Sequence, residues 1–322
     1  MSSFSQIIGH ERQKHLLRQA WQHQRLAHAY LFSGPAGIGK RLMALALARL
    51  LFCPSGTGCG QCPACRRIDH NNHPDLHLVE PVDGQILIEA IRTLQQQLAL
   101  RPYEADRHIV LIDDAHLLNS SAANALLKTL EEPPGSCLLL LISSQPQQLL
   151  DTIRSRCQNL PFNRLSIDQI SQILQQQIAD PEQRELLIRL TEGSLTRALG
   201  SDHELYLQRR RSLFAQLSRL SPQTIVPLLE LAEELAGDKE QLPELLGLLL
   251  SCYRDVFILA HQGAAALVIN RDLLDPLTRL AHQCGPQRAG HRLAALLQAH
   301  SQLLTTANRQ LIMENLLIRL VN

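Results

Sequence analysis

The sequence of 322 residues is poor in aromatic side chains, in lysine and in net charge. Aromatic residues make up only 3% of it, which argues against a β-sandwich or barrel, because such folds rely on Tyr, Phe and Val. The 65 leucines favour packed helices instead. With 31 basic and 30 acidic side chains the net charge is +1, too balanced for gripping a nucleic acid through bulk charge. We therefore expect a mainly helical protein whose role on DNA, if it has one, is local or shared.

Long apolar runs are also missing from the sequence. No stretch approaches the ~20 apolar residues that a membrane span needs. Residues 1–13 carry no basic segment followed by an apolar one, as a signal peptide would. We therefore expect a cytosolic protein. The hydrophobic fraction of 45% is still large enough for cores, which excludes wholesale disorder, and the length corresponds to two domains or three small ones.

Strand and helix patterns alternate through the first half of the chain. Apolar strands are predicted at 29–33, 75–80, 108–113 and 137–143, and helices at 41–51, at 85–98 and from the cap Asn119 to residue 130. This alternation predicts a doubly wound α/β domain. Beyond Phe162 the strand pattern ends, and Leu-rich helices follow with breaks near Ser221, Gly237, Gly263 and Gly285. The predicted fold class is α/β plus all-α, with a P-loop α/β domain at 1–163, a small helical lid of three short helices at 164–201 and a helical bundle at 202–322.

A glycine-rich loop follows the first predicted strand and contains Gly34, Gly37, Gly39 and Lys40. Its spacing is that of a Walker A loop, whose backbone N–H groups cradle phosphates while the lysine reaches the β and γ phosphates. The chain has only four lysines, so composition alone does not account for a lysine at this position. The alternative is a glycine-rich turn in a fold that once bound phosphate. The last motif position, normally a Ser or Thr that ligates Mg²⁺, is Arg41.

Asp113 and Asp114 close the third predicted strand in the manner of a Walker B element. In that element the first carboxylate holds the metal and the next residue, normally Glu, orients the attacking water. Asp114 is one methylene shorter than Glu, which withdraws its carboxylate by about 1.5 Å, and a misplacement of about 1 Å can cost ~100-fold in rate. Since Arg41 is altered as well, we predict that ATP or ADP binds weakly or not at all and that there is no useful turnover.

Four of the eight cysteines, Cys53, Cys59, Cys62 and Cys65, fall within thirteen residues of a Gly- and Pro-rich segment. Their spacing predicts a tetrahedral metal site at 53–65, with zinc favoured over an iron–sulfur cluster because no redox motif accompanies them. Buried free thiols would explain an isolated cysteine but not four together. Four thiolates leave no open position, so the predicted site is structural. The nearby His70, His73 and His77 are interpreted as surface residues or as supports of this site.

Further segments combine with these motifs into a specific resemblance. They read Ile-Ile-Gly-His at 7–10, Leu-Ala-His-Ala-Tyr-Leu-Phe-Ser-Gly-Pro at 26–35, His-Pro-Asp at 73–75, Ala-Leu-Leu-Lys-Thr-Leu-Glu-Glu-Pro-Pro at 125–134, Ser-Arg-Cys at 155–157 and Gly-Ser-Leu-Thr-Arg-Ala-Leu at 193–199. Together with the phosphate loop and the cysteines, they make the chain similar to the clamp-loader ATPases of the AAA+ superfamily. The similarity covers residues 1 to about 200, whereas the last third matches in length and helical character alone.

The resemblance implies a place in the five-subunit clamp loader of bacterial DNA polymerase III, beside motor subunits of the gamma or tau type and a delta subunit. Such a complex loads a ring-shaped sliding clamp onto primed DNA. The resemblance makes Arg156 an arginine finger that reaches the γ-phosphate held by a neighbouring motor subunit, and a guanidinium supplied in trans can raise hydrolysis ~10³- to 10⁵-fold. A surface ion pair is the alternative for Arg156, and Arg154 is a second candidate for the finger.

The resemblance also assigns sensor positions. It places sensor 1 at Ser143 or Ser144 and sensor 2 at Arg197, where the side chains would contact a γ-phosphate or hold the lid. It places Ile7 and Ile8 at an adenine pocket, although such apolar residues are equally typical of core. The run 209–211, three consecutive arginines, could face DNA or partner subunits, but a solvated helix face is favoured because no aromatic or glycine residue interrupts the run.

Three functions compete at this point. The favoured one is a non-hydrolysing loader subunit with no independent catalysis, which donates Arg156 and uses the helical bundle as an oligomerisation collar. The second is an active motor ATPase of the gamma or tau type, against which Arg41 and Asp114 argue. The third is a zinc-dependent DNA-binding regulator, against which the near-neutral charge argues.

Overall fold

The computed structural model describes residues 4–5, 7–175, 178–191, 203–219, 225–237, 242–303 and 307–321. They belong to two compact units, one formed by residues 1–177 with 193–197 and the other by residues 178–192 with 198–322. Each unit has cores of its own and is described by itself.

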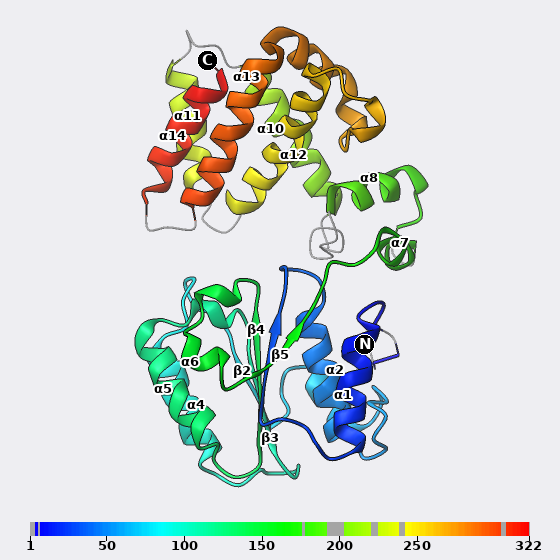
Figure 1. Cartoon of the computed structure of the whole chain (residues 1–322), viewed down its shortest axis with the longest axis vertical. Helices are drawn as coiled ribbons and strands as arrows, with labels where there is room; N and C mark the ends of the chain where they lie inside the picture. The colour runs from blue at the N-terminus through cyan, green and yellow to red at the C-terminus, as the bar shows by residue number, and fades with distance from the viewer. Residues whose placement is uncertain are drawn as a thin grey trace. The chain divides into compact units, whose positions relative to one another are not determined.

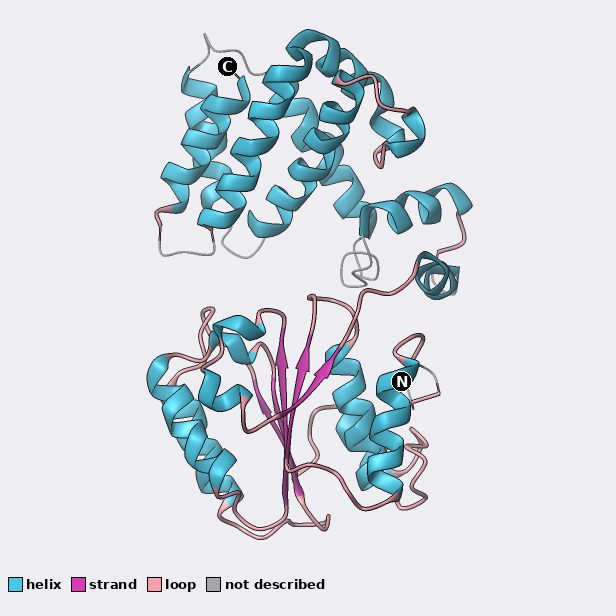
Figure 2. Cartoon of the chain, viewed as in Figure 1, coloured by secondary structure: helices cyan, strands magenta, loops and turns pink. Residues whose placement is uncertain are grey.

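The first unit is built on a sheet (Figure 2). Its five strands are parallel and lie in the order β2-β3-β4-β1-β5. The strands are β1 Ala29–Ser33, β2 Leu76–Val79, β3 His108–Ile112, β4 Cys137–Ser143 and β5 Gln158–Pro161. β1 and β3 are buried along their whole length, because both faces of a parallel sheet are covered by helices. Four strands confirm the sequence prediction, and β5, at one edge, was not predicted.

Helices cover both faces of this sheet, as Figures 1 and 2 show. Alternate residues of β1 separate the two cores: Tyr30 and Phe32 pack on one side, Ala29 and Leu31 on the other. One side is covered by α1 Glu11–Gln22, α2 Lys40–Phe52 and α3 Pro63–Asp69. The other side is covered by α4 Ile88–Leu98, α5 Ser120–Glu131 and α6 Asp151–Arg154, with short 3₁₀ turns at Ala115–Leu117 and Pro146–Gln148.

A side-chain cap and a backbone turn explain where two of the predicted helices begin. The Asn119 side chain accepts a hydrogen bond from the Ala122 N–H at 2.8 Å and caps α5, as predicted. α4 begins three residues later than the predicted start at residue 85, because Val82 and Gln85 pair their backbones in a tight turn. α1 was not predicted, since Leu17 is its only fully buried apolar side chain.

The predicted lid coincides with the join between the two units. α7 Ile167–Gln175 belongs to the first unit and α8 Pro181–Thr191 to the second. The third short helix expected before residue 200 falls outside the described residues. A separate lid at 164–201 therefore stays a prediction.

The second unit is a helical bundle, which confirms the all-α part of the predicted fold class. Besides α8, its described α-helices are α10 His203–Arg219, α11 Ile225–Gly237, α12 Leu242–Ala260, α13 Leu274–Gln302 and α14 Arg309–Val321. α12 packs along α13, while α14 packs against α11 and α13 (Figure 1). The predicted breaks are present at Gly237, at Gly263 and at Gly285, whose φ of 67° interrupts α13. The break predicted near Ser221 lies outside the described residues. None of the helices in the described segments is long and apolar enough to cross a membrane.

The arginine run on α10 corrects one prediction. Arg210 is 1% exposed, so it is not part of a solvated face. Its guanidinium donates to Asn270 Oδ1 at 2.6 Å and pairs with Asp272. Asp255 on α12 accepts hydrogen bonds from the backbone N–H groups of Ile269 and Asn270. These groups fix the 261–273 connection to α10 and α12, because a buried guanidinium is stable only with acceptors around it.

Candidate nucleotide site and metal centre

The phosphate loop leaves the carboxyl end of β1, where ligands of parallel α/β sheets bind. Gly34 N–H donates to the Ser143 carbonyl at 3.2 Å. A Cβ at Gly34 would lie 2.2 Å from the Phe162 carbonyl oxygen, so only glycine fits. Gly39, with φ 98°, then turns the chain into α2. The predicted loop, including Gly37, is therefore present at the start of a helix, as a Walker A element requires.

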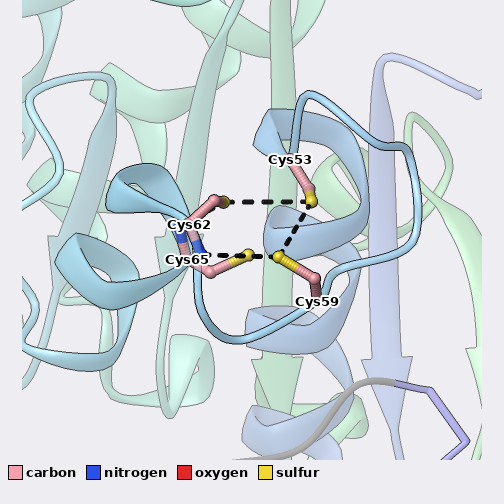
Figure 3. A group of neighbouring side chains, drawn as sticks. All are labelled: Cys53, Cys59, Cys62 and Cys65. Carbon is pink, nitrogen blue, oxygen red and sulfur yellow. Dashed lines mark hydrogen bonds between the residues drawn. The ribbon is translucent and has the colours of Figure 1, made fainter.

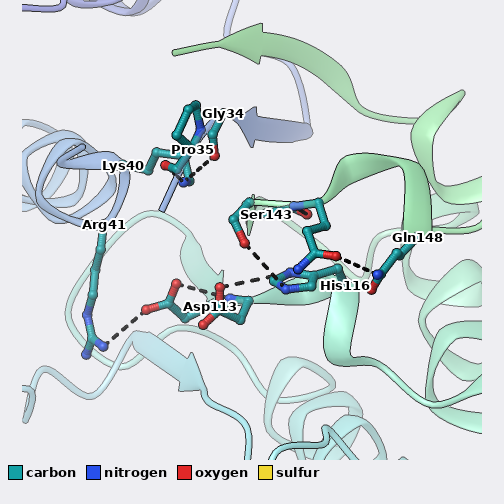
Figure 4. A network of polar contacts seen from close by, with 11 residues as sticks. Gly34, Pro35, Lys40, Arg41, Asp113, His116, Ser143 and Gln148 are labelled. Atoms are coloured by element: carbon teal, nitrogen blue, oxygen red, sulfur yellow. Dashed lines mark hydrogen bonds and ion pairs between the residues drawn. The ribbon is translucent and has the colours of Figure 1, made fainter. Parts of the chain in front are cut away.

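Lys40 is turned back onto the loop that carries it (Figure 4). Its Nζ donates to the carbonyls of Gly34 at 2.7 Å and Pro35 at 2.6 Å, and the residue is 5% exposed. Burial lowers the pKa of Lys40, while the carboxylates of Asp114 and Asp113 oppose this change. The Lys40 ammonium group is thus hydrogen-bonded to backbone carbonyls of its own loop. In a nucleotide-binding loop, the same group would contact a phosphate.

Arg41 lies where a Walker A loop has its metal-ligating hydroxyl, and its guanidinium contacts two carboxylates. Nη1 is 2.5 Å from Glu80 Oε1 and 3.2 Å from Asp113 Oδ2, and Figure 4 shows the contact with Asp113. Asp113 is the carboxylate expected to hold Mg²⁺. Because the guanidinium already neutralises it and residue 41 offers no hydroxyl, the residues present do not fit a magnesium ion.

The two Walker B aspartates differ in environment. Burial and the charge of Asp114 raise the pKa of Asp113, and the Arg41 guanidinium opposes this rise. Asp114 has a left-handed backbone with φ 44°, its side chain is 47% exposed, and its Oδ1 lies 3.9 Å from His116 Nδ1. Burial lowers the pKa of His116, with the charge of Asp114 opposing. The Asp114 side chain, which is shorter than the usual glutamate, is thus about half exposed and lies beside the His116 imidazole.

Ser143 and Ser144, the two candidates for sensor 1, both lie at the end of β4. Ser143 is fully buried, and its Oγ accepts a hydrogen bond from the Gln145 N–H at 3.1 Å. Ser144 Oγ lies 3.5 Å from His116 Nε2. The structure therefore places this strand end beside the phosphate loop and the Walker B turn, while Arg197, predicted for sensor 2, lies outside the described residues.

The expected adenine pocket begins before α1. Ile7 is 7% exposed and belongs to the core, whereas Ile8 is half-buried. His10 Nε2 lies 2.7 Å from the Ile38 carbonyl of the phosphate loop. The residues of this motif thus lie beside the loop, and their contact with adenine stays a prediction.

Arg156 is bound to its own chain at α5 and α6. Its Nη2 is 2.6 Å from Glu131 Oε1 and its Nη1 donates to the Thr152 carbonyl at 3.0 Å. The side chain remains 36% exposed. Arg154 pairs with Asp151, three residues earlier on α6. Both arginines thus form surface ion pairs, the alternative considered above for Arg156, and none of the contacts described for Arg156 involves the phosphate loop.

The four cysteines converge as their spacing predicts. Figure 3 shows the sulfurs of Cys53, Cys59, Cys62 and Cys65 facing one another. All four Sγ atoms lie within 4.8 Å of one another, with Cys53 to Cys59 at 3.6 Å and Cys53 to Cys62 at 3.9 Å. Four sulfurs about 2.3 Å from one tetrahedral ion would be about 3.8 Å apart. The cluster therefore has dimensions suited to a single tetrahedral metal ion.

Local structure brings the sulfurs together. Cys53 caps the end of α2, and Cys62 caps the start of α3 by accepting from the Cys65 N–H at 3.4 Å, with Pro63 at the first helical position. Arg49 on α2 pairs with Asp69 on α3 and joins the two helices. α2 thus begins at the phosphate loop and ends at the cysteine cluster.

The thiols of the cluster differ in acidity: burial raises the pKa of Cys65 to about 12, whereas the pKa values of Cys53 and Cys59 are lowered. Burial would raise the pKa of Cys53, but hydrogen bonds from Ser55 and Cys59 outweigh it and lower that pKa to about 5. Backbone N–H groups of Gln61 and Cys62 lower the pKa of Cys59. Thiolates are the form that binds metal.

Two of the three histidines after the cluster, His73 and His77, have structural partners, whereas His70 is exposed, as predicted for a surface residue. His73 is 4% exposed and its ring stacks on Phe52 with 4.3 Å between centroids, so the interpretation of it as a surface residue is wrong. The ring of the half-buried His77 lies within hydrogen-bond distance of His108, with 3.1 Å between Nε2 and Nδ1. The spacing of these histidines gave no sign of either partner.

The sequence interpretation missed two residues that form ion pairs with predicted site residues. Glu80, just after β2, shares the Arg41 guanidinium with Asp113, and Glu131 holds Arg156. Parallel strands end at the same edge of a sheet, so an acid directly after β2 could have been placed near the Walker B strand. No comparable signal marks Glu131.

Both halves of the chain match known protein families of the same enzyme complex. The family described as "DNA polymerase III, delta subunit" matches residues 9–166, and the family described as "DNA polymerase III, delta subunit, C terminal" matches residues 204–322. Among solved structures, a gamma subunit-related protein of Thermotoga maritima aligns with 90% of this chain and 99% of its own, at 19% identity and a TM-score of 0.43. That likeness is too weak to add to the fold described above.

Curated relatives cover nearly the whole chain. The DNA polymerase III subunit delta′ of Bacillus subtilis is 34% identical over 95% of this chain and 94% of its own. The delta′ subunit of Escherichia coli is 32% identical over 94% of this chain and 91% of its own. The tau subunit of Escherichia coli is 31% identical, but the chain spans about half of tau's length, 46%. The chain therefore belongs to the family of bacterial DNA polymerase III subunits named delta-prime.

Proposed function

We propose that the chain is a clamp-loader subunit that does not hydrolyse ATP and that donates Arg156 to a neighbouring motor subunit. The observation that carries the first half is the contact of Arg41 with Asp113 and Glu80. The Arg41 guanidinium contacts Asp113, the carboxylate that would have to bind Mg²⁺ for hydrolysis. Two further features also disfavour hydrolysis: Lys40 is hydrogen-bonded to its own loop, and Asp114 is one methylene shorter than the usual glutamate.

The second part of the proposal, the arginine finger, requires the Arg156 guanidinium to exchange one partner for another. Arg156 is held by a half-exposed ion pair with Glu131, and such pairs contribute about 0–1 kcal/mol. The γ-phosphate of a nucleotide bound next door is a stronger bidentate partner for a guanidinium. Exchanging Glu131 for that phosphate is therefore favourable, and the flanking Ser155 and Cys157 match the family motif.

The loader itself supplies the test of the finger. We expect Arg156→Ala to leave the complex assembled and to lower its DNA-stimulated ATP hydrolysis by about 10³-fold at the site it faces. Arg154→Ala, two residues away and also ion-paired, is the matched control and should hydrolyse like the wild type. Equal hydrolysis by wild type and Arg156→Ala in an intact complex would refute the finger.

The partners follow from the family. Motor subunits of the gamma or tau type and a delta subunit complete the proposed pentamer, which contacts the sliding clamp and primed DNA. The alternative, a motor ATPase, has the 31% identical tau subunit in its favour. Arg41 and Asp114 oppose it, because a motor needs a metal and a fully extended glutamate at those positions. Mixing the chain with gamma or tau and delta and weighing the product tests the assembly directly.

We further propose that Cys53, Cys59, Cys62 and Cys65 hold a structural zinc ion. Four thiolate ligands in a tetrahedral set leave no position for water or substrate. The ion would link the end of α2 to α3, and its proposed role is to fix that side of the first unit. Metal analysis should give one zinc per chain, and iron with visible absorbance would refute the assignment.

A further inference from the structure

The contacts that hold Arg156 lie where α5 and α6 pack against each other (Figure 1). Glu131 is the last residue of α5 and supplies a carboxylate, with 2.6 Å between its Oε1 and Arg156 Nη2. The carbonyl of Thr152 on α6 is the second acceptor, at 3.0 Å from Arg156 Nη1. Both acceptors engage the guanidinium itself, which is the group that the proposed finger must present to a neighbouring subunit.

Both contacts can be released without leaving a buried polar group unpaired. The side chains of Arg156 and Glu131 are 36% and 49% exposed, so water can solvate both charges once they separate. The Thr152 carbonyl keeps a donor as well, because the Ser155 hydroxyl donates to it at 3.1 Å. Arg210 is the opposite case, since it is 1% exposed and the loss of its partners would leave a buried charge. The contacts of Arg156 are thus suited to reversible release.

The backbone on either side of Arg156 is anchored in the core. Ile153 is fully buried and Cys157 is 8% exposed, and both belong to the core on one face of the sheet. The Arg156 N–H donates to the Ile153 carbonyl at 3.1 Å. Because the chain is fixed on both sides, a change of side-chain rotamer is enough to move the guanidinium from Glu131 to another acceptor.

The end of α5 attracts a cation. The unpaired carbonyls at the C-terminal end of a helix carry partial negative charge, and the adjacent Glu131 and Glu132 add two carboxylates there. Glu131 forms the ion pair with Arg156, whereas the ion pairs within the described ranges include none for Glu132. One acid therefore holds the guanidinium, and its neighbour in the sequence offers a natural comparison.

We propose that Glu131 is a positioning residue that holds Arg156 back until a neighbouring subunit binds ATP. Release of the guanidinium contributes to the free energy of ATP binding next door, so the strength of the Glu131 contact sets the ATP concentration at which the finger engages. An exposed ion pair changes such an equilibrium by at most about fivefold. The inference rests on the proposed function, because it requires Arg156 to be the finger.

The ATP dependence of the reconstituted loader tests the role of Glu131. Glu131→Gln keeps the size of the side chain and removes its charge. We expect it to lower the KM for ATP at the site that Arg156 faces by about two- to fivefold and to leave kcat unchanged, because saturating ATP engages the finger in both loaders. Glu132→Gln is the matched control and should keep the wild-type KM. A sizing column checks that each loader is assembled.

Arg156→Ala supplies the second comparison. Because Glu131 acts through Arg156, Glu131→Gln should have no effect in a loader that already carries Arg156→Ala. Equal KM values for the wild-type and Glu131→Gln loaders, combined with reduced hydrolysis by Arg156→Ala, would overturn the role of Glu131 and leave the finger supported. A lower KM that persists in the Arg156→Ala background would overturn it as well. Full hydrolysis by the Arg156→Ala loader would refute the proposed function and this inference together.

Discussion

At the scale of single residues, Arg41 decides the chemistry of the phosphate loop. We expect Arg41→Thr to restore a hydroxyl and to free Asp113, so that nucleotide binding becomes Mg²⁺-dependent and tightens by about tenfold or more. Calorimetry with ADP, with and without Mg²⁺, measures the change. Arg41→Lys, which keeps a cation near Asp113, should show no gain. A wild type that already binds Mg²⁺–ADP as tightly as the threonine variant would contradict this prediction.

The cysteine cluster gives a second prediction for a single residue. Cys59→Ser removes one ligand, so the chain should lose its zinc and the first unit should lose about 3 kcal/mol or more of unfolding free energy. Metal analysis and urea unfolding follow the two effects. Cys137→Ser is the control, because that thiol lies in β4 outside the cluster and burial raises its pKa to about 12. Full zinc content in Cys59→Ser would show that the proposed ligand set is wrong.

At the scale of elements, the buried ion pair of α10 determines how the second unit holds its 261–273 connection. Removing one partner of a buried pair costs about 3–5 kcal/mol, so Arg210→Met should destabilise this unit by about that much. Arg211→Met is matched to it, because the Arg211 side chain is 56% exposed and reaches the same Asp272. We expect the control to change stability by about 1 kcal/mol or less. Urea denaturation of both variants measures the difference, and equal stabilities would contradict it.

Elements that are specified by a local pattern of residues were predictable from the sequence. β1, β3 and β4 are short apolar runs, and the phosphate loop and the cysteines are fixed by local spacing. β5 was not predictable, because its burial pattern is set by pairing with β1 at the edge of the sheet. Arg210 was misjudged for the same reason: its partner Asn270 is 60 residues away, and no periodicity records that contact.

At the scale of the whole molecule, the division into two units with separate cores predicts that the parts can be separated. A chain that ends at residue 201 retains both faces of the sheet and all four cysteines, along with α8 of the second unit, so it should fold and bind one zinc. It lacks α10 to α14 and with them the expected collar, so it should not associate with gamma or tau. Metal analysis, circular dichroism and co-elution on a sizing column measure these properties together, with the full chain as control. Stable association of the shortened chain would place the assembly contact in the first unit, and loss of zinc would show that the first unit depends on the bundle.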